Sequence, residues 1–166
     1  MDATTLRQRT SREEYYLDLA FRSSAQGTCL RRNYGVTIVD DYHTIVATGY
    51  TGAPRGQAHC GEIGYCYRQM HNIPPGHDYT RCRSVHAEQN AINYAGRDAR
   101  GCTLYLAGCD ATTGAIVVQY PCFQCAKSIL NAGIKMIVIR DQPPNPPIRI
   151  TPEALYAQRV REYLGE

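Results

Sequence analysis

The most informative absence in this 166-residue sequence is that of a long apolar run. A membrane-spanning helix needs about 20 consecutive apolar residues, and no stretch approaches that length. Residues 1–10 are polar and lack the apolar centre of a secretory signal peptide. We therefore expect residues 1–10 to form a flexible arm, and we expect a cytoplasmic protein without a membrane partner.

A strong excess of charge of one sign is absent as well. The sequence has 18 Lys and Arg against 15 Asp and Glu, which gives a net charge of +3. So mild a balance argues against a nucleic-acid partner and is compatible with an anionic small molecule. Charged residues are 20% and hydrophobic residues 43% of the chain, as in ordinary globular proteins. We expect one domain over residues 11–166, with no internal repeat.

Eight cysteines are many for a chain of this length. In a secreted protein they would predict disulfide bonds. Because residues 1–10 carry no export signal, metal binding is the better interpretation.

A first metal-binding pattern lies in residues 84–92, which read SVHAEQNAI. Positions i, i+3, i+7 and i+10 share one face of a helix, and Glu88 falls on such a face with Val85, Ile92 and Ala95. A carboxylate on an apolar helix face costs free energy unless it is paired or has a chemical role. Glu88 is therefore a candidate catalytic residue, beside the candidate ligand His86.

A second pattern lies in residues 120–127, which read YPCFQCAK. Pro121 is typical of a helix start and Gly133 of a helix end. Cys122 and Cys125 then lie in the first turn of this helix, where the helix dipole favours the thiolate. The thiolate is the form of cysteine that binds zinc.

Together the two patterns offer three zinc ligands, His86, Cys122 and Cys125. Three protein ligands leave the fourth tetrahedral position open, as in catalytic rather than structural sites. Zinc at such a site lowers the pKa of a bound water from ~15.7 to ~7, and Glu88 could carry its proton. Each pattern alone is a weak signal. The first also occurs in ordinary surface helices, and the second could be a redox dithiol or half of a zinc ribbon. A zinc-stapled scaffold without catalysis is a further alternative, but it has no need of Glu88.

The pairing of H-x-E with P-C-x-x-C is the signature of zinc nucleobase deaminases. The sequence resembles the cytidine and deoxycytidylate deaminase superfamily, and is most similar to deoxycytidylate deaminases over residues 11–141. The resemblance implies that His86, Cys122 and Cys125 hold a catalytic zinc and that Glu88 shuttles protons. It implies deamination of dCMP to dUMP with release of ammonia, in a homo-oligomer, commonly a hexamer. Alternatives are another cytosine nucleotide or nucleoside, a related heterocycle such as a pterin or riboflavin precursor, or an RNA-editing deaminase.

The order of expected elements predicts an α/β protein, a three-layer α/β/α sandwich. The resemblance implies the same fold, a cytidine deaminase-like fold with a mixed central sheet of about five strands. The pattern predicts strands at 34–39, 44–50, 103–107, 116–119 and 134–140. It predicts helices at about 11–27, 86–97, 121–133 and 151–164.

Residues 57–83 form a cysteine-containing insert with little regular periodicity, apart from a short helix expected near Cys66. A loop poor in apolar residues needs something besides hydrophobic burial to order it. The resemblance implies a second metal here in many members. We expect a second, structural zinc, held by Cys29, Cys60, Cys66 and Cys82, with His71, His77 or His59 as alternates for one cysteine. Cys102 and Cys109 are interpreted as small buried hydrophobic residues.

The substrate-binding residues are the least defined part of the sequence. Arg55, in the glycine- and proline-rich loop 49–56, and Arg32 are candidates for binding a phosphate, because arginine can do so bidentately. Asn33 is a candidate for sugar or base contact, and the backbone at Ala87 for the pyrimidine carbonyl. The ordinary alternatives are solvated surface arginines and a turn residue at Asn33. Thr51 stands where the family usually has Asn, in a loop tied to regulation by nucleoside triphosphates, so we expect weak or absent activation by dCTP.

Overall fold

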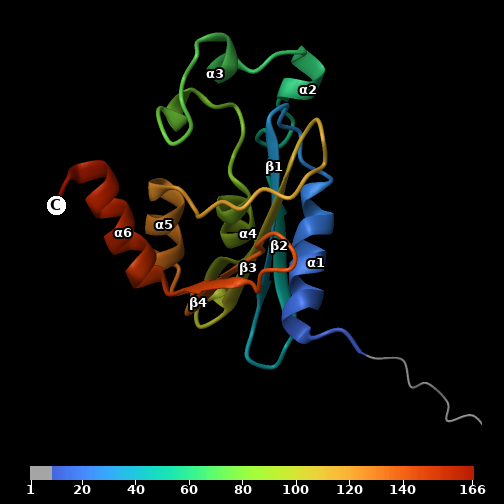
Figure 1. Cartoon of the computed structure of the whole chain (residues 1–166), viewed down its shortest axis with the longest axis vertical. Coiled ribbons are helices and arrows are strands. Elements are labelled where there is room, and N and C mark those ends of the chain that lie inside the picture. Colours follow the sequence, from blue (N-terminus) through green and yellow to red (C-terminus); the bar gives the residue numbers. More distant parts are fainter. Residues whose placement is uncertain (1–8) are drawn as a thin grey trace, which may run out of the picture.

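A five-stranded mixed sheet forms the centre of the computed structural model, which describes residues 9–166 (Figure 1). The strand order is β2-β1-β3-β4-β5; β3 and β4 are parallel and the other neighbours antiparallel. The strands are β1 (Arg32–Val39), β2 (Ile45–Tyr50), β3 (Thr103–Asp110), β4 (Met136–Ile139) and β5 (Ile148–Ile150). Residues 1–8 of the expected arm lie outside the described residues.

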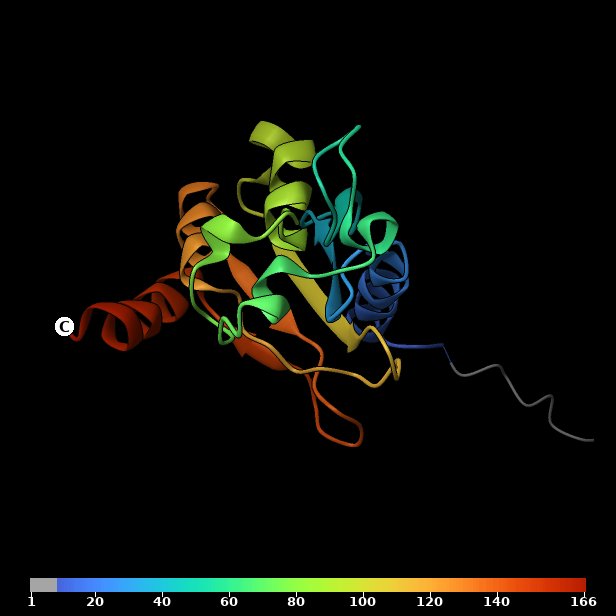
Figure 2. The ribbon, with the colours of Figure 1, turned by 90° about the horizontal axis from the view of Figure 1, so that it is seen from above.

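Helices cover both faces of the sheet, which confirms the expected three-layer sandwich (Figures 1 and 2). Helix α1 (Arg12–Ser24) lies on one face, and α4 (Ala87–Ala95) and α5 (Phe123–Asn131) lie on the other. Helix α6 (Pro152–Leu164) packs against α5 at the outside. Among residues 9–166, no helix combines the length and apolar composition needed to cross a membrane.

Two glycines allow the helices to approach the sheet closely. A Cβ atom at Gly35 would lie 1.9 Å from the carbonyl oxygen of Ala20 in α1. A Cβ atom at Gly49 would lie 2.4 Å from the backbone nitrogen of Ala91 in α4. Gly49 pairs with Val36 of β1 and so faces the same side of the sheet as Val36. Gly35 precedes Val36 and therefore faces the opposite side, so each glycine lies against a different helix.

The helix starts follow the expected caps. The Ser11 hydroxyl accepts a hydrogen bond from the Glu14 N–H at 3.1 Å, and the Thr151 hydroxyl accepts one from the Ala154 N–H at 3.3 Å. Such caps satisfy backbone donors that have no partner inside the helix. Pro152, fully buried, occupies the first turn of α6 as predicted.

The strand expected at residues 116–119 is wrong, and the fifth strand is β5 instead. Only an isolated bridge joins Ile116 to Cys109 at the end of β3. Beyond Val117 the chain leaves the sheet and runs toward α5. On the way, Gln119 and Tyr120 line a pocket. The sequence did not predict β5, whose three residues follow a proline-rich loop and pair with β4.

The insert folds over the end of the sheet at which β1 begins and β3 ends (Figures 1 and 2). It contains two one-turn helices, α2 (Cys60–Ile63) and α3 (Tyr67–Met70), and a 3-10 turn, η1 (Tyr79–Arg81). The helix expected near Cys66 is confirmed as α3. Helix α4 covers most of the range 86–97 expected for it, and a second 3-10 turn, η2 (Gly96–Ala99), follows it.

The substitution Gly49→Ala is expected to lower the free energy of unfolding by about 1–3 kcal/mol, the usual cost of overpacking a filled core. The added methyl group would meet backbone atoms of Ala87 and Ala91, which cannot move without shifting α4. Urea denaturation measures the loss. Gly52→Ala is the matched control, since its Cβ would have no neighbour closer than 3.4 Å. Equal losses in the two variants would contradict this account.

Candidate active site and metal centre

Three side chains meet where the N-termini of α4 and α5 converge. His86 is the N-cap residue of α4, Cys122 is the N-cap residue of α5, and Cys125 lies one turn further along α5. The Nδ1 atom of His86 lies 3.4 Å from the Sγ of Cys122 and 3.3 Å from the Sγ of Cys125. The structure thus brings together the three residues that the sequence proposed as zinc ligands.

The spacing of these atoms fits a tetrahedral zinc ion. With zinc–nitrogen and zinc–sulfur bonds of about 2.0 and 2.3 Å, tetrahedral geometry puts neighbouring nitrogen and sulfur ligands about 3.5 Å apart. The observed nitrogen–sulfur distances are within a few tenths of an ångström of this value. Over residues 9–166 this is the one group of three His, Cys, Asp or Glu side chains whose ligand atoms all lie within 4.8 Å of one another.

The two cysteines differ in their pKa. A hydrogen bond from Cys125, followed by the interaction with His86, lowers the pKa of Cys122 to about 4. The hydrogen bond to Cys122 and burial both raise the pKa of Cys125 well above its usual range. Cys122 is therefore a thiolate at neutral pH, which is the form that zinc binds.

Glu88 lies in the first turn of α4 with only 6% of its surface exposed. Burial raises the pKa of its carboxyl group, and the positive charge of His86 opposes that shift. Among the described residues that line the pocket, Glu88 is the sole carboxylate. A buried carboxylate beside a metal site is suited to moving protons between a water molecule and a bound substrate.

The insert forms one wall of this pocket. The ring of Tyr79 meets the ring of His86 edge-on, with centroids 4.7 Å apart. The guanidinium carbon of Arg68 lies over the Tyr79 ring, 4.4 Å from its centre. Arg68 is only 7% exposed, and it donates hydrogen bonds to the carbonyl oxygens of Pro74 and His77. Both wall residues were missed in the sequence, because one-turn helices leave no periodic signal.

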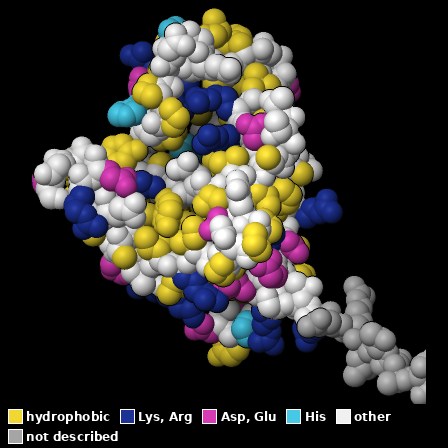
Figure 3. All heavy atoms as spheres, in the orientation of Figure 1, with side chains coloured by type: hydrophobic (Ala, Val, Ile, Leu, Met, Phe, Trp, Pro, Cys, Tyr) yellow, Lys and Arg dark blue, Asp and Glu magenta, His cyan; other side chains and the backbone are white. Residues whose placement is uncertain are grey.

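Basic side chains surround the pocket. Arg31, Arg32 and Arg68 line it, and Figure 3 shows Lys or Arg side chains in a hollow on this face. The buried Nε of Arg68 has no hydrogen-bond partner among the described residues. The pocket therefore offers positive charge close to the proposed metal ligands.

Three of the substrate-binding candidates from the sequence, Arg55, Asn33 and Ala87, are not among the residues that line the pocket. Arg55 is exposed in its loop. The side-chain oxygen of Asn33 accepts a hydrogen bond from the Cys29 N–H at 3.1 Å, as a turn residue would. Ala87 is fully buried in the core. Thr51 does line the pocket, with its hydroxyl accepting a hydrogen bond from the Tyr34 N–H.

The four cysteines expected to hold a second metal gather at the base of the insert. Burial and then the nearby Cys29, Cys66 and Cys82 raise the pKa of Cys60. The backbone N–H of Arg31 donates to the Cys29 sulfur at 3.4 Å. Within residues 9–166, no three of these thiols lie within 4.8 Å of one another.

The three histidines named as alternates are engaged elsewhere. The Nδ1 of His59 accepts a hydrogen bond from the Glu62 N–H as the cap of α2. His71 stacks on Tyr67, and its Nδ1 lies 2.9 Å from the Tyr67 carbonyl oxygen. His77 lies beside Tyr163 of α6. These positions favour an all-cysteine set over a mixed one.

Comparison with known proteins agrees with this geometry. Residues 10–140 match the family model described as the cytidine and deoxycytidylate deaminase zinc-binding region. The chain belongs to the cytidine and deoxycytidylate deaminase family. Members of this family are zinc-dependent hydrolases.

Two relatives show how the family match extends along the chain. The deoxycytidylate deaminase of Mycobacterium phage D29 is 36% identical over 132 residues, which cover 76% of this chain and 91% of that protein. The deoxycytidylate deaminase of Schizosaccharomyces pombe is 33% identical over 132 residues. That match covers 80% of this chain but only 38% of the yeast protein.

A solved structure shares the fold. The dCMP deaminase of the cyanophage S-TIM5, in its apo form, superposes with a TM-score of 0.59 at 22% identity. The superposition covers 92% of this chain and 94% of that chain. This superposition agrees with the α/β/α sandwich of the chain.

Proposed function

We propose that this protein hydrolyses deoxycytidylate, so that dCMP and water give dUMP and ammonia. The observation that carries the proposal is the buried Glu88 beside the ligand set His86, Cys122 and Cys125, in a pocket lined by arginines. Relatives at 31–36% identity that are named deoxycytidylate deaminases support the choice of substrate.

His86, Cys122 and Cys125 would hold the zinc ion. When bound, zinc lowers the pKa of a coordinated water toward neutrality. Glu88 is the group that accepts the water's proton and delivers it to N3 of the cytosine ring. It then carries the second proton of the water to the exocyclic amine at C4, which leaves as ammonia. The overall reaction consumes one water and leaves Glu88 in its starting state.

The arginines of the pocket would bind the 5′-phosphate of the substrate. Arg31 and Arg32 stand at the start of β1, and Arg68 approaches from the insert. A guanidinium group binds phosphate through charge-assisted hydrogen bonds, which are stronger than neutral ones. In this assignment Arg32 keeps the role expected from the sequence and Arg55 does not.

A second zinc, bound by Cys29, Cys60, Cys66 and Cys82, would order the insert. Cys60 and Cys66 are buried, and none of the four cysteines belongs to the main hydrophobic core cluster. The backbone N–H of Arg31 donates to the sulfur of Cys29. Burial raises the pKa of Cys82, and a backbone hydrogen bond at Ser84 opposes that rise. Since the insert carries Arg68 and Tyr79, this ion would support the pocket wall without taking part in the reaction.

The substitution Glu88→Gln is expected to lower kcat by at least ~10²–10⁴-fold, the usual contribution of general acid–base catalysis, while the zinc content stays unchanged. Ammonia release from dCMP and elemental analysis measure the two quantities. Glu153→Gln, an exposed acid in the first turn of α6, is the control. Turnover near the wild-type rate in Glu88→Gln would remove the proton-carrying role from this residue.

Removing a pocket arginine should weaken the preference for a phosphorylated substrate. We expect Arg31→Gln or Arg32→Gln to lower kcat/KM for dCMP by about 10- to 100-fold, because hydrogen bonds to charged groups contribute about 1.5–3 kcal/mol. The value for deoxycytidine should change little. Arg55→Gln is the control, since Arg55 is exposed away from the pocket. Equal kcat/KM for dCMP and deoxycytidine in the wild type would indicate a nucleoside enzyme.

Metal stoichiometry tests the second zinc. Elemental analysis of protein purified without chelators should find two zinc ions per chain. Cys60→Ser should remove one ion and Cys125→Ser the other, whereas Cys109→Ser, the control, should keep both. A single ion in the wild type, or a disulfide joining two of the cysteines Cys29, Cys60, Cys66 and Cys82, would contradict this assignment.

A further inference from the structure

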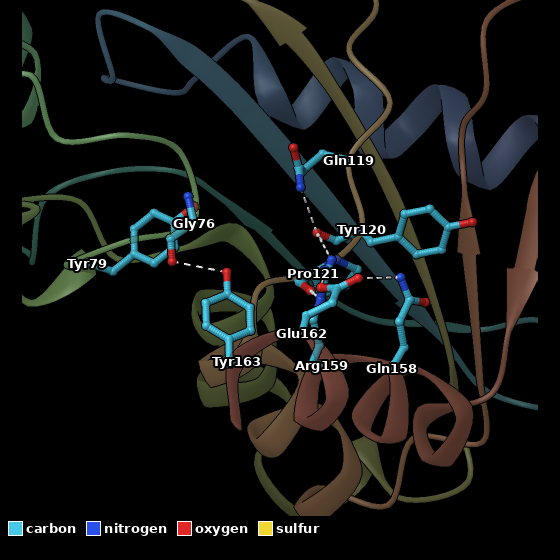
Figure 4. A network of polar contacts seen from close by, with 9 residues as sticks. All are labelled: Gly76, Tyr79, Gln119, Tyr120, Pro121, Gln158, Arg159, Glu162 and Tyr163. Carbon is cyan, nitrogen blue, oxygen red and sulfur yellow. Dashed lines mark hydrogen bonds and ion pairs between the residues drawn. The ribbon is translucent and has the colours of Figure 1, made fainter. Parts of the chain in front are cut away.

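Helix α6 lies beyond residues 10–140, the part of the chain that matches the family model. It nevertheless reaches two segments of the pocket (Figure 4). One is the chain immediately before Cys122, and the other is the part of the insert that leads to Tyr79. The expected function of the site does not explain these contacts.

The first contact is made by Arg159, which is only 8% exposed. Its Nε donates to the Pro121 carbonyl oxygen at 2.9 Å, and its Nη2 donates to the Tyr120 carbonyl oxygen at 3.3 Å (Figure 4). Its Nη1 pairs with Glu162, which also accepts a hydrogen bond from Gln158 at 2.8 Å. One guanidinium group thus holds two successive carbonyls and is itself held by a carboxylate on its own helix.

These two carbonyls precede the metal ligand directly. Cys122 follows Pro121 and caps α5, so its position depends on the backbone angles of the two residues before it. Pro121 is fully buried, and a buried carbonyl that loses its donor is unfavourable. Arg159 therefore constrains the backbone that leads into Cys122, and with it the position of the Cys122 side chain.

The second contact is made by Tyr163, one turn further along α6. Its hydroxyl donates to the Gly76 carbonyl oxygen at 3.0 Å, and the Gly76 N–H donates to the Tyr79 hydroxyl at 3.2 Å. The ring of Tyr79 in turn packs edge-on against His86. A chain of contacts thus runs from α6 through the insert to a second metal ligand. The ring of Tyr163 also stacks on Phe123, the residue after Cys122, at a centroid distance of 5.6 Å.

We propose that α6 belongs to the active site, with Arg159 and Tyr163 as positioning residues that fix Cys122 and the Tyr79 wall from outside the pocket. The inference rests on the proposed function for the identity of the bound metal and substrate. Arg159 acts through the Tyr120 and Pro121 carbonyls, and Tyr163 acts through Gly76. Neither residue lines the pocket, so neither touches the substrate.

The Arg159 contact is tested by zinc release, which needs no substrate. Zinc-loaded Arg159→Gln is expected to lose the ion from the catalytic site to a chromogenic chelator about 10-fold faster than the wild type, as is typical when the support of a metal ligand is removed. The rate is measured in a Cys60→Ser background, so that the ion of the insert does not contribute. Arg161→Gln is the control, because Arg161 is exposed on the same helix. If Arg159→Gln does not fold, Arg159→Lys is used instead. Lysine keeps the positive charge but cannot bind both carbonyls in the same way, so its rate of zinc release should lie between that of the wild type and the roughly 10-fold faster rate expected for Arg159→Gln.

The Tyr163 contact is tested by Tyr163→Phe, which removes only the hydroxyl. Amide hydrogen exchange should become faster in residues 76–82 and stay unchanged in α1. KM for dCMP should rise roughly 2- to 10-fold with kcat little changed, the effect of one lost hydrogen bond. Tyr156→Phe is the control, since the Tyr156 hydroxyl has no hydrogen-bond partner within the described part of the chain and its ring also stacks on Phe123.

The proposal is overturned if Arg159→Gln and Arg159→Lys release zinc at the rate of Arg161→Gln, or if exchange in residues 76–82 is the same in Tyr163→Phe and Tyr156→Phe. Both readouts are independent of dCMP. A wild-type protein that failed to deaminate dCMP would therefore contradict the proposed function while leaving the positioning role of α6 open to the same two measurements.

Discussion

The constraint on which the site depends is that two helix N-termini must meet at one point. His86 and Cys122 each cap a helix in an extended backbone conformation, with ψ angles of 151° and 171°. Their side chains meet because α4 and α5 lie on the same face of the sheet. Gly49 sets how closely α4 can approach that face, since any larger residue would meet the helix backbone. The sheet thus acts as the scaffold that sets the distance between ligands far apart in the sequence.

Burial of a carboxylate is the second physical feature of the site. Glu88 is held in a position that raises its pKa, which disfavours its charged form. Apolar residues at such a position would make a more stable helix face. A buried carboxylate is consistent with a role in proton transfer. Proton transfer by such a glutamate is part of the chemistry of the family to which the chain belongs.

The rest of the pocket is assembled from parts with little structure of their own. The insert supplies Arg68 and Tyr79, the start of β1 supplies Arg31 and Arg32, and the segment 119–122 supplies Gln119, Tyr120 and Cys122. One-turn helices such as α2 and α3 are not stable in isolation. Contacts with α6 hold the insert and the segment before Cys122 in place. In our proposal a second zinc also supports the insert. The homo-oligomer implied by the resemblance stays a prediction, as does the weak response to dCTP expected from Thr51.

The sequence by itself determined the sandwich, the helix caps at Ser11 and Thr151, and the grouping of His86, Glu88, Cys122 and Cys125 as one site. These follow from local patterns, namely helical periodicity, cap residues and ligand spacing, which survive without knowledge of neighbours. Only the tertiary structure decided the fifth strand, the burial of Arg68 and the reach of Arg159 to the Pro121 carbonyl. The residues joined in these three cases are 6 to 38 positions apart, and no helical or strand period encodes their contacts. The sequence alone does not distinguish an arginine exposed to water, such as Arg55, from one buried against the carbonyls before Cys122, such as Arg159. The packing of the whole chain sets the position of each.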